Sequence, residues 1–151
     1  MKGYLKPLMV VDGGKILRSD YTILIADRNS HVREFIKREM TKEGFRVILA
    51  ETGKDVIEMI NQRIPLDLVL LDPELPDMDE IVLLKKIEDR VPRLPVVIHA
   101  FDSQETNYFL YLKQAAFVEK AGQSIEILKQ KVTEILEAAN LKPPGCVRVE
   151  T

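Results

Sequence analysis

The chain has 151 residues, 46% of them hydrophobic and 30% charged, a balance typical of one globular domain with a sizeable apolar core. Its 22 Lys and Arg against 24 Asp and Glu give a net charge of -2, which excludes a general basic surface for nucleic acid or anionic lipid. A single cysteine, Cys146, excludes an intrachain disulfide and a cysteine-cluster metal site. We expect a cytoplasmic protein without a membrane span, because the apolar runs are short and no secretory signal begins the chain.

Three regions differ in pattern along the chain. Residues 1 to 20 are predicted to form an N-terminal arm or hairpin, with a disordered leader as the alternative. Residues 21 to 139 alternate short apolar runs with amphipathic stretches, which predicts strands and helices of a parallel α/β sheet. Residues 140 to 151 include two prolines and a glycine that cannot continue a helix, so they are predicted to be a tail or linker.

Five runs are predicted to be strands, and several are apolar throughout, as strands buried on both faces of a sheet should be. They are Thr22 to Ala26, Arg46 to Ala50, Leu68 to Leu71, Pro95 to His99 and Ala116 to Glu119.

A helical pattern follows each predicted strand. The first helix has Asn29 or Ser30 as its expected N-cap and Gly44 as its stop. The third is expected at about 80 to 88, the fourth at about 104 to 113, and the fifth is the longest. The positions expected to face inward are Val32, Phe35, Ile36 and Met40 in the first, Val56, Ile57 and Ile60 in the second, Ile81, Leu84 and Ile87 in the third, and Ile125, Leu128, Val132, Ile135 and Leu136 in the fifth.

Charged residues follow the ends of the first, third and fifth predicted strands. Ligands of open parallel sheets bind beyond the carboxyl ends of the strands, so chemistry is expected there. Asp27, Asp72 and Lys120 are therefore expected to converge.

Four motifs in order resemble a response-regulator receiver domain (CheY-like) of two-component signalling, over roughly residues 21 to 137. The resemblance implies a doubly wound, five-stranded parallel sheet of strand order 2-1-3-4-5, the flavodoxin-like fold. The motifs are Ile23-Leu24-Ile25-Ala26-Asp27, then Asp67-Leu68-Val69-Leu70-Leu71-Asp72 with Leu75-Pro76-Asp77-Met78-Asp79, then Leu94-Pro95-Val96-Val97, then Phe117-Val118-Glu119-Lys120.

The resemblance also implies roles for single residues. Asp72 stands at the position of the phosphoacceptor, and Lys120 at that of the lysine that contacts the phosphoryl group. Mg²⁺ would be held by Asp27, Asp72 and the backbone carbonyl of Glu74, and would neutralise charge on the phosphoryl oxygens. Phe117 matches an aromatic that reports phosphorylation by changing rotamer.

The sequence departs from the family pattern at several site positions. Arg28 replaces the second acid of the metal-binding pair, and the side chains of the site then sum to zero charge instead of -2. Two interpretations of Arg28 are open: a counterion paired with Asp72, or a side chain turned to solvent. Ala100 replaces the Ser or Thr of the switch, Ala121 replaces a proline, and Glu80 replaces a common glycine.

Aromatic residues are concentrated between residues 101 and 117. A helix of about ten residues cannot bury Tyr108, Phe109 and Tyr111 on one face, so we expect part of this surface to bind an output partner or a second copy. Core packing is the alternative. His31 and His99 are expected to be structural or surface residues.

The resulting prediction is a signalling switch, not a turnover enzyme, that accepts a phosphoryl group at Asp72 from a histidine kinase or phosphotransfer protein. The alternative is a degenerate receiver that binds proteins without phosphorylation, as Arg28 and Ala100 suggest. A haloacid dehalogenase type of phosphatase needs an Asp two residues after the nucleophile, where Glu74 stands. A dinucleotide site needs a glycine-rich turn after the first strand, and the sequence has none there.

Overall fold

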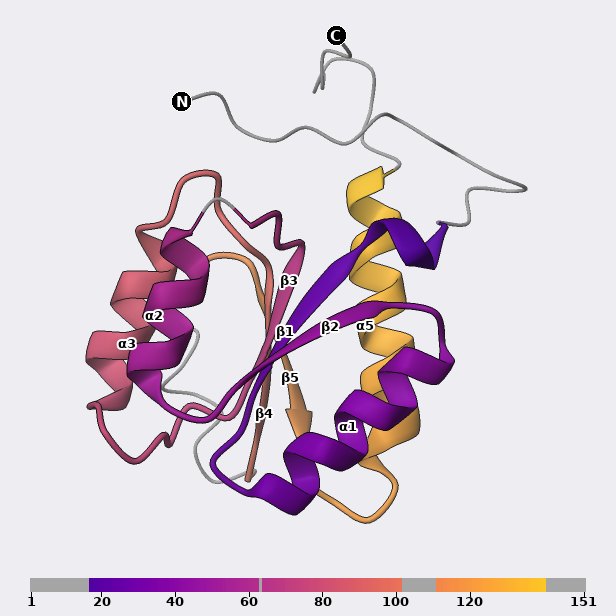
Figure 1. The fold of residues 1–151 in the computed structure, drawn as a ribbon, viewed down its shortest axis with the longest axis horizontal. Coiled ribbons are helices and arrows are strands. Elements are labelled where there is room, and N and C mark those ends of the chain that lie inside the picture. The colour runs from indigo at the N-terminus through magenta and orange to yellow at the C-terminus, as the bar shows by residue number, and fades with distance from the viewer. Residues whose placement is uncertain (1–16, 63, 102–110, 141–151) are drawn as a thin grey trace, which may run out of the picture.

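The computed structural model describes residues 17–62, 64–101 and 111–140. Figure 1 shows a central sheet with α1 and α5 on one face and α2 and α3 on the other. The strands are β1 (Thr22–Ala26), β2 (Arg46–Ala50), β3 (Leu68–Leu71), β4 (Val96–Ala100) and β5 (Ala115–Glu119). The helices are η1 (Arg18–Asp20), α1 (Ser30–Lys42), α2 (Gly53–Asn61), α3 (Glu80–Glu88) and α5 (Ser124–Asn140).

The sheet has five strands in the order β2-β1-β3-β4-β5, and all neighbouring pairs are parallel. This order confirms the predicted doubly wound, flavodoxin-like fold. The bounds of β1, β2 and β3 are those predicted from the sequence. The fourth strand is Val96–Ala100 instead of Pro95 to His99, because Pro95 has no N–H to donate and Ala100 pairs with Glu119. The fifth begins one residue earlier than predicted, at Ala115, which pairs with Val96.

Successive residues of β1 supply both halves of the core. Leu24 and Ala26 pack with α2 and α3, whereas Ile23 and Ile25 pack with α1 and α5. Side chains alternate across a strand, and helices cover both faces of this one, so every position of β1 is buried. The run from Ile23 to Ala26 is apolar because both faces of the strand are buried.

The first helix begins and ends at the predicted signals. The Asn29 side chain accepts hydrogen bonds from the N–H groups of His31 and Val32, and Gly44 follows the helix with a φ of 103°. The expectation that Phe35 faces the core is wrong: it is 39% exposed and lies under the Arg38 guanidinium, 5.1 Å from the ring centroid. Buried Ile36 and Met40 form the centre of the inward face of α1, and Phe35 lies at its edge.

The third helix, α3, also has one residue that was expected in the core and is exposed. Asp79 caps α3 by accepting from the N–H groups of Ile81 and Val82. Ile81 was expected inside but is 37% exposed, because the buried face of α3 is formed by Leu83, Leu84 and Ile87. A residue in the first turn of a helix can satisfy the helical period and still lie at the edge of the buried face.

Several expectations fall on residues outside the described part. They are most of the N-terminal arm (1–16), nearly all of the fourth predicted helix with Tyr108 and Phe109, and the C-terminal tail from residue 141. Within the described part, residues 18–20 form a short 3-10 helix and α5 continues to Asn140. The helices that the structure describes include none that is long and apolar enough to cross a bilayer.

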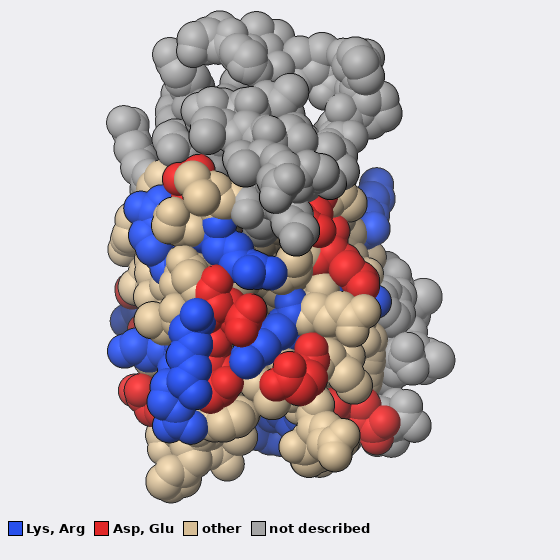
Figure 2. Space-filling view, turned by 90° about the vertical axis from the view of Figure 1, so that its right-hand side faces the viewer, with Lys and Arg blue, Asp and Glu red and all other residues tan. Residues whose placement is uncertain are grey.

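Figure 2 views the molecule from the side of α1 and α5. Acidic and basic side chains lie interspersed on this face instead of forming a patch of one sign. Lys129 of α5 contacts Glu39 at 3.0 Å and Glu43 at 3.5 Å, and thereby links α5 to α1 and the residue that follows it.

Candidate functional site

The backbone of the sheet places the three charged residues that the sequence predicts to converge. The backbone N–H of Asp27 donates to Ala50, that of Asp72 to Ala26, and that of Lys120 to Ala100, at 3.4, 2.8 and 2.8 Å. Each acceptor is the last residue of a neighbouring strand, so these bonds continue the sheet pairing by one residue. The three side chains therefore leave the same edge of the sheet.

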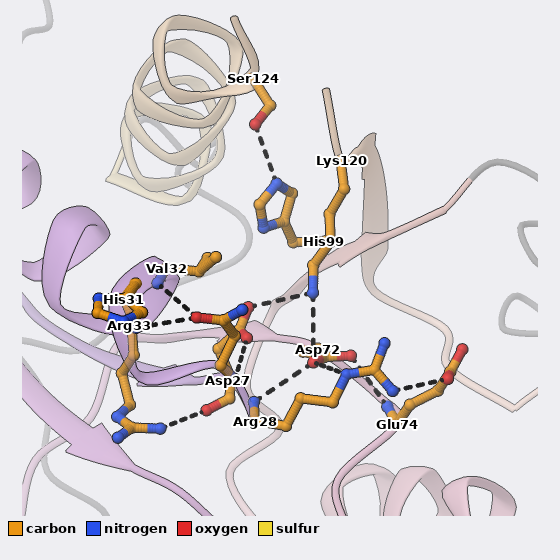
Figure 3. A network of polar contacts seen from close by, with 11 residues as sticks. Asp27, Arg28, His31, Val32, Arg33, Asp72, Glu74, His99, Lys120 and Ser124 are labelled. Atoms are coloured by element: carbon orange, nitrogen blue, oxygen red, sulfur yellow. Dashed lines mark hydrogen bonds and ion pairs between the residues drawn. The ribbon is translucent and has the colours of Figure 1, made fainter. Parts of the chain in front are cut away.

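The structure brings Asp27, Asp72 and Lys120 together, as Figure 3 shows. Lys120 Nζ lies 3.3 Å from Asp27 Oδ2 and 3.3 Å from Asp72 Oδ2. Both acid side chains are almost fully buried. Burial raises the pKa of Asp27, and the Asn29 N–H and the Lys120 ammonium oppose that rise. The lysine thus stabilises the ionised form of the Asp27 carboxyl group, which burial disfavours.

Arg28 adopts the paired arrangement, one of the two that the sequence left open. Its Nε lies 3.4 Å from Asp72 Oδ2, and its Nη1 donates to Glu74 Oε1 at 2.9 Å. The Arg28 side chain is 41% exposed, whereas that of Asp72 is 2% exposed. Burial alone would lower the pKa of Arg28, but attraction by Asp72 and Glu74 outweighs it and raises that pKa. Arg28 therefore covers Asp72 on its solvent side as a permanent cation.

Both oxygens of the Asp72 carboxylate contact donors or cations. Its Oδ1 accepts the N–H of Glu74 at 3.1 Å, and its Oδ2 accepts the N–H of Arg28 at 3.4 Å beside the two cationic groups. Mg²⁺ requires free oxygens in an octahedron. In the part of the chain described here, no three His, Cys, Asp or Glu side chains are grouped to hold a metal. The residues in this arrangement do not fit Mg²⁺, because a guanidinium already occupies Asp72.

The two expected switch positions lie on the last two strands. Ala100 is buried at the end of β4 and has no hydroxyl for a phosphoryl group. Phe117 of β5 pairs with Ile98 and is partly buried against the core on the side of α2 and α3. Tyr111, the described member of the aromatic group, is also partly buried there, with Lys85 Nζ 5.8 Å from its ring centroid. These three side chains are not part of the group formed by Asp27, Asp72 and Lys120.

Two residues near the site were not identified from the sequence. Arg33 of α1 is buried, donates to the backbone carbonyl of Asp27 at 2.7 Å and lies 3.5 Å from Glu51. His99 of β4 is buried and shares a hydrogen bond of 3.1 Å with Ser124 Oγ. Burial lowers the pKa of His99 to about 4, and the nearby Lys120 ammonium adds to this effect. A histidine inside an apolar strand was the available signal, and from it we expected only a structural or surface residue.

Comparison with known proteins agrees with this geometry. A family model described as the response regulator receiver domain matches residues 23–137. The "DNA-binding transcriptional regulator NtrC" of Klebsiella pneumoniae is 33% identical over 93 residues, 62% of this chain and 20% of that protein. The response regulator GtcR of Aneurinibacillus migulanus is 28% identical over 125 residues, 82% of this chain and 51% of that protein. The chain spans about a fifth to a half of these curated relatives.

Solved structures share the fold. A two-component response regulator from Clostridium difficile is 27% identical with a TM-score of 0.71, covering 80% of this chain and 98% of that one. The response regulator TrrA of Thermotoga maritima, solved in complex with Mg²⁺-BeF, is 22% identical with a TM-score of 0.67, covering 76% and 98%. At that identity the second structure supports the fold alone.

Proposed function

Because this chain belongs to the response regulator receiver domain family of two-component systems, we propose that Asp72 accepts a phosphoryl group from a phosphohistidine of a histidine kinase or phosphotransfer protein. The observation that supports this is the buried Asp72 carboxylate at the end of β3, with Lys120 Nζ 3.3 Å away. Receiver domains are generally signalling modules that are not themselves enzymes. We propose that this one is also a switch.

The proposed transfer forms one bond and breaks one. A carboxylate oxygen of Asp72 attacks phosphorus, and an acyl phosphate O–P bond forms as the N–P bond of the donor breaks. The electron pair of the N–P bond returns to the imidazole nitrogen of the donor. Lys120 remains beside the transferred group and stabilises the negative charge on its oxygens. Asp27 holds Lys120 from the other side, at 3.3 Å.

Arg28 controls access to Asp72 in this proposal. Asp72 is almost completely buried beneath a guanidinium that is itself 41% exposed, so Arg28 has to move before a donor can reach the carboxylate. The same movement would free Asp72 for Mg²⁺, together with Asp27 and the Glu74 carbonyl, the ligands expected from the family. The contact of Arg28 with Glu74 joins two partly exposed side chains, and such a pair contributes up to about 1 kcal/mol. Separating Arg28 from the buried Asp72 carboxylate costs more, because that charge then loses a partner.

A phosphorylation-independent protein-binding module is the second candidate. The observation that favours it is the Arg28 pair with Asp72 and Glu74, which holds the site in a charge-satisfied state without a phosphoryl group. Ala100, which has no hydroxyl to contact such a group, agrees with this candidate. The two candidates differ in whether Asp72 is ever modified.

Intact-mass spectrometry after incubation with acetyl phosphate distinguishes them, with and without Mg²⁺. We expect one phosphoryl adduct on the natural chain and none on Asp72→Asn. Arg28→Asp is expected to speed labelling about 5-fold or more, the factor that corresponds to about 1 kcal/mol. Arg38→Asp is the matched control, because it makes the same charge change on an exposed part of α1. It is expected to label at the rate of the natural chain.

Other outcomes would change the assignment. Labelling of Arg28→Asp alone would identify Arg28 as a lock and support the second candidate for the natural chain. The absence of an adduct on both the natural chain and Arg28→Asp would reject phosphorylation at Asp72. An adduct that persists in Asp72→Asn would place the acceptor elsewhere.

A further inference from the structure

A pocket of about 480 Å³ lies beside the acidic site, at the start of α1, the end of β4 and the start of α5. Its described lining is mostly apolar and includes Phe35, Ile125 and Leu128. A volume of this order and an apolar lining with a few polar groups are typical of sites that bind small molecules. The pocket is concave space that the core of the protein does not fill.

One residue of the described lining, Gly122, has no side chain. It lies in the turn between β5 and α5 and lines the pocket. A Cβ atom added at Gly122 would meet no other atom within 4 Å. By contrast, a Cβ at Gly53 would lie 2.9 Å from that of Met78. The turn before α5 therefore has room for a side chain and has none.

A buried polar group lines the same pocket. The His99 side chain is part of the lining and the residue is 3% exposed. Its Nε2 bonds to Ser124, but its Nδ1 has no hydrogen-bond partner among the described residues. In Figure 3 the unbonded nitrogen faces the side of α1 on which Val32 lies, and Val32 lines the pocket too. A buried polar atom without a partner is rare in folded proteins, so this nitrogen has an unused capacity for one hydrogen bond.

We propose that this pocket binds a neutral aromatic molecule of one or two rings, with one hydrogen-bonding group that pairs with Nδ1 of His99. Rings from His31, Phe35, His99 and Phe101 in the lining favour an aromatic partner. Lys120 is the one lysine, arginine or acidic residue in the described lining. Its ammonium is already paired with both buried acids, so it offers no free charge to an ionic ligand.

This inference does not depend on phosphorylation of Asp72. It does place the ligand next to the site, because Lys120 and Phe101 line the pocket and Lys120 Nζ lies 5.9 Å from the Phe101 ring centroid. A bound molecule would therefore contact the same lysine that holds the two acids.

The test is a titration of the whole ¹⁵N-labelled chain with 2-naphthol, followed by NMR of the backbone amides and of the histidine ring nitrogens. We expect saturable shifts at Gly122, Ser124 and Leu128, and at Nδ1 of His99. Gly122→Phe and Gly122→Leu, which add a side chain at the open position, are expected to weaken binding at least 10-fold. Thr41→Phe adds the same ring in a separate depression on α1 and is expected to bind as the natural chain does.

The hydrogen bond has its own control. 2-Methylnaphthalene has the same rings with a methyl in place of the hydroxyl. The preference of the natural chain for 2-naphthol over 2-methylnaphthalene is expected to fall about 2- to 10-fold in His99→Leu, the value of one hydrogen bond. An unchanged preference would refute the role of Nδ1.

Three further results would overturn the proposal: no saturation with 2-naphthol, equal binding by both folded Gly122 variants, or shifts that map away from the pocket. Tighter binding of N-acetyltyrosinamide than of 2-naphthol would also overturn it. That result would assign the pocket to an aromatic side chain of a protein partner instead of a free small molecule.

Discussion

Acidification should destabilise this protein through His99 in particular. The pKa of His99 in the folded chain is about 4, against 6.5 for an ordinary histidine. Between these values the unfolded chain binds a proton at this ring and the folded chain does not, so the free energy of unfolding decreases as the pH falls from 6.5 to 4. The contribution of the neutral His99 ring to the free energy of unfolding is complete above pH 6.5 and is lost below pH 4. A difference of about 2.5 pKa units corresponds to about 3 kcal/mol.

Urea unfolding at pH 7, 6, 5 and 4, on the natural chain and on His99→Leu, measures this contribution. Asp27, whose raised pKa acts in the opposite sense, is present in both proteins and cancels in the difference. We expect the difference in the free energy of unfolding to change by about 3 kcal/mol in favour of His99→Leu from pH 7 to pH 4. Parallel profiles for the natural chain and His99→Leu would refute the reasoning.

Two other predictions concern packing and the link between helices. Gly53→Ala is expected to cost about 1 to 3 kcal/mol in urea unfolding, because its Cβ would lie 2.9 Å from the Met78 Cβ, whereas Gly122→Ala should cost little. A smaller decrease in the free energy of unfolding for Gly53→Ala than for Gly122→Ala would contradict this prediction. Lys129→Met is expected to lower the melting temperature at low salt and much less at high salt, because the lysine holds Glu39 at 3.0 Å near solvent. A loss independent of salt would point to packing instead of charge.

Most of the fold could be predicted from the sequence because periodicity and strand burial agree. The run from Ile23 to Ala26 is apolar because helices cover both faces of the strand, and the run itself predicts that cover. Where the sequence failed, the cause was geometric. Phe35 and Ile81 satisfy the helical period, but each lies at the edge of its helix's buried face. Periodicity gives the direction of a side chain and not the extent of the surface that it meets.

The approach of the three charged residues could be predicted from the sequence, but the other contacts of the site could not. The ends of parallel strands meet at one edge, so the approach of Lys120 to Asp27 and Asp72 follows from the topology. The position of Arg28 did not follow, because a long side chain on a loop can reach a carboxylate or turn to solvent with similar free energy. The bond between His99 and Ser124 joins residues 25 positions apart, and no local pattern marks such a pair.

The backbone bonds that place Asp27, Asp72 and Lys120 carry a consequence for how this protein can evolve. Each of the three residues is positioned by an N–H bonded to the last residue of a neighbouring strand, and any amino acid except proline can make that bond. The backbone geometry at this edge of the sheet therefore does not depend on which side chains these positions carry. A side chain such as that of Arg28, which lies 3.4 Å from Asp72, can therefore change the charge of the site without any change in the sheet.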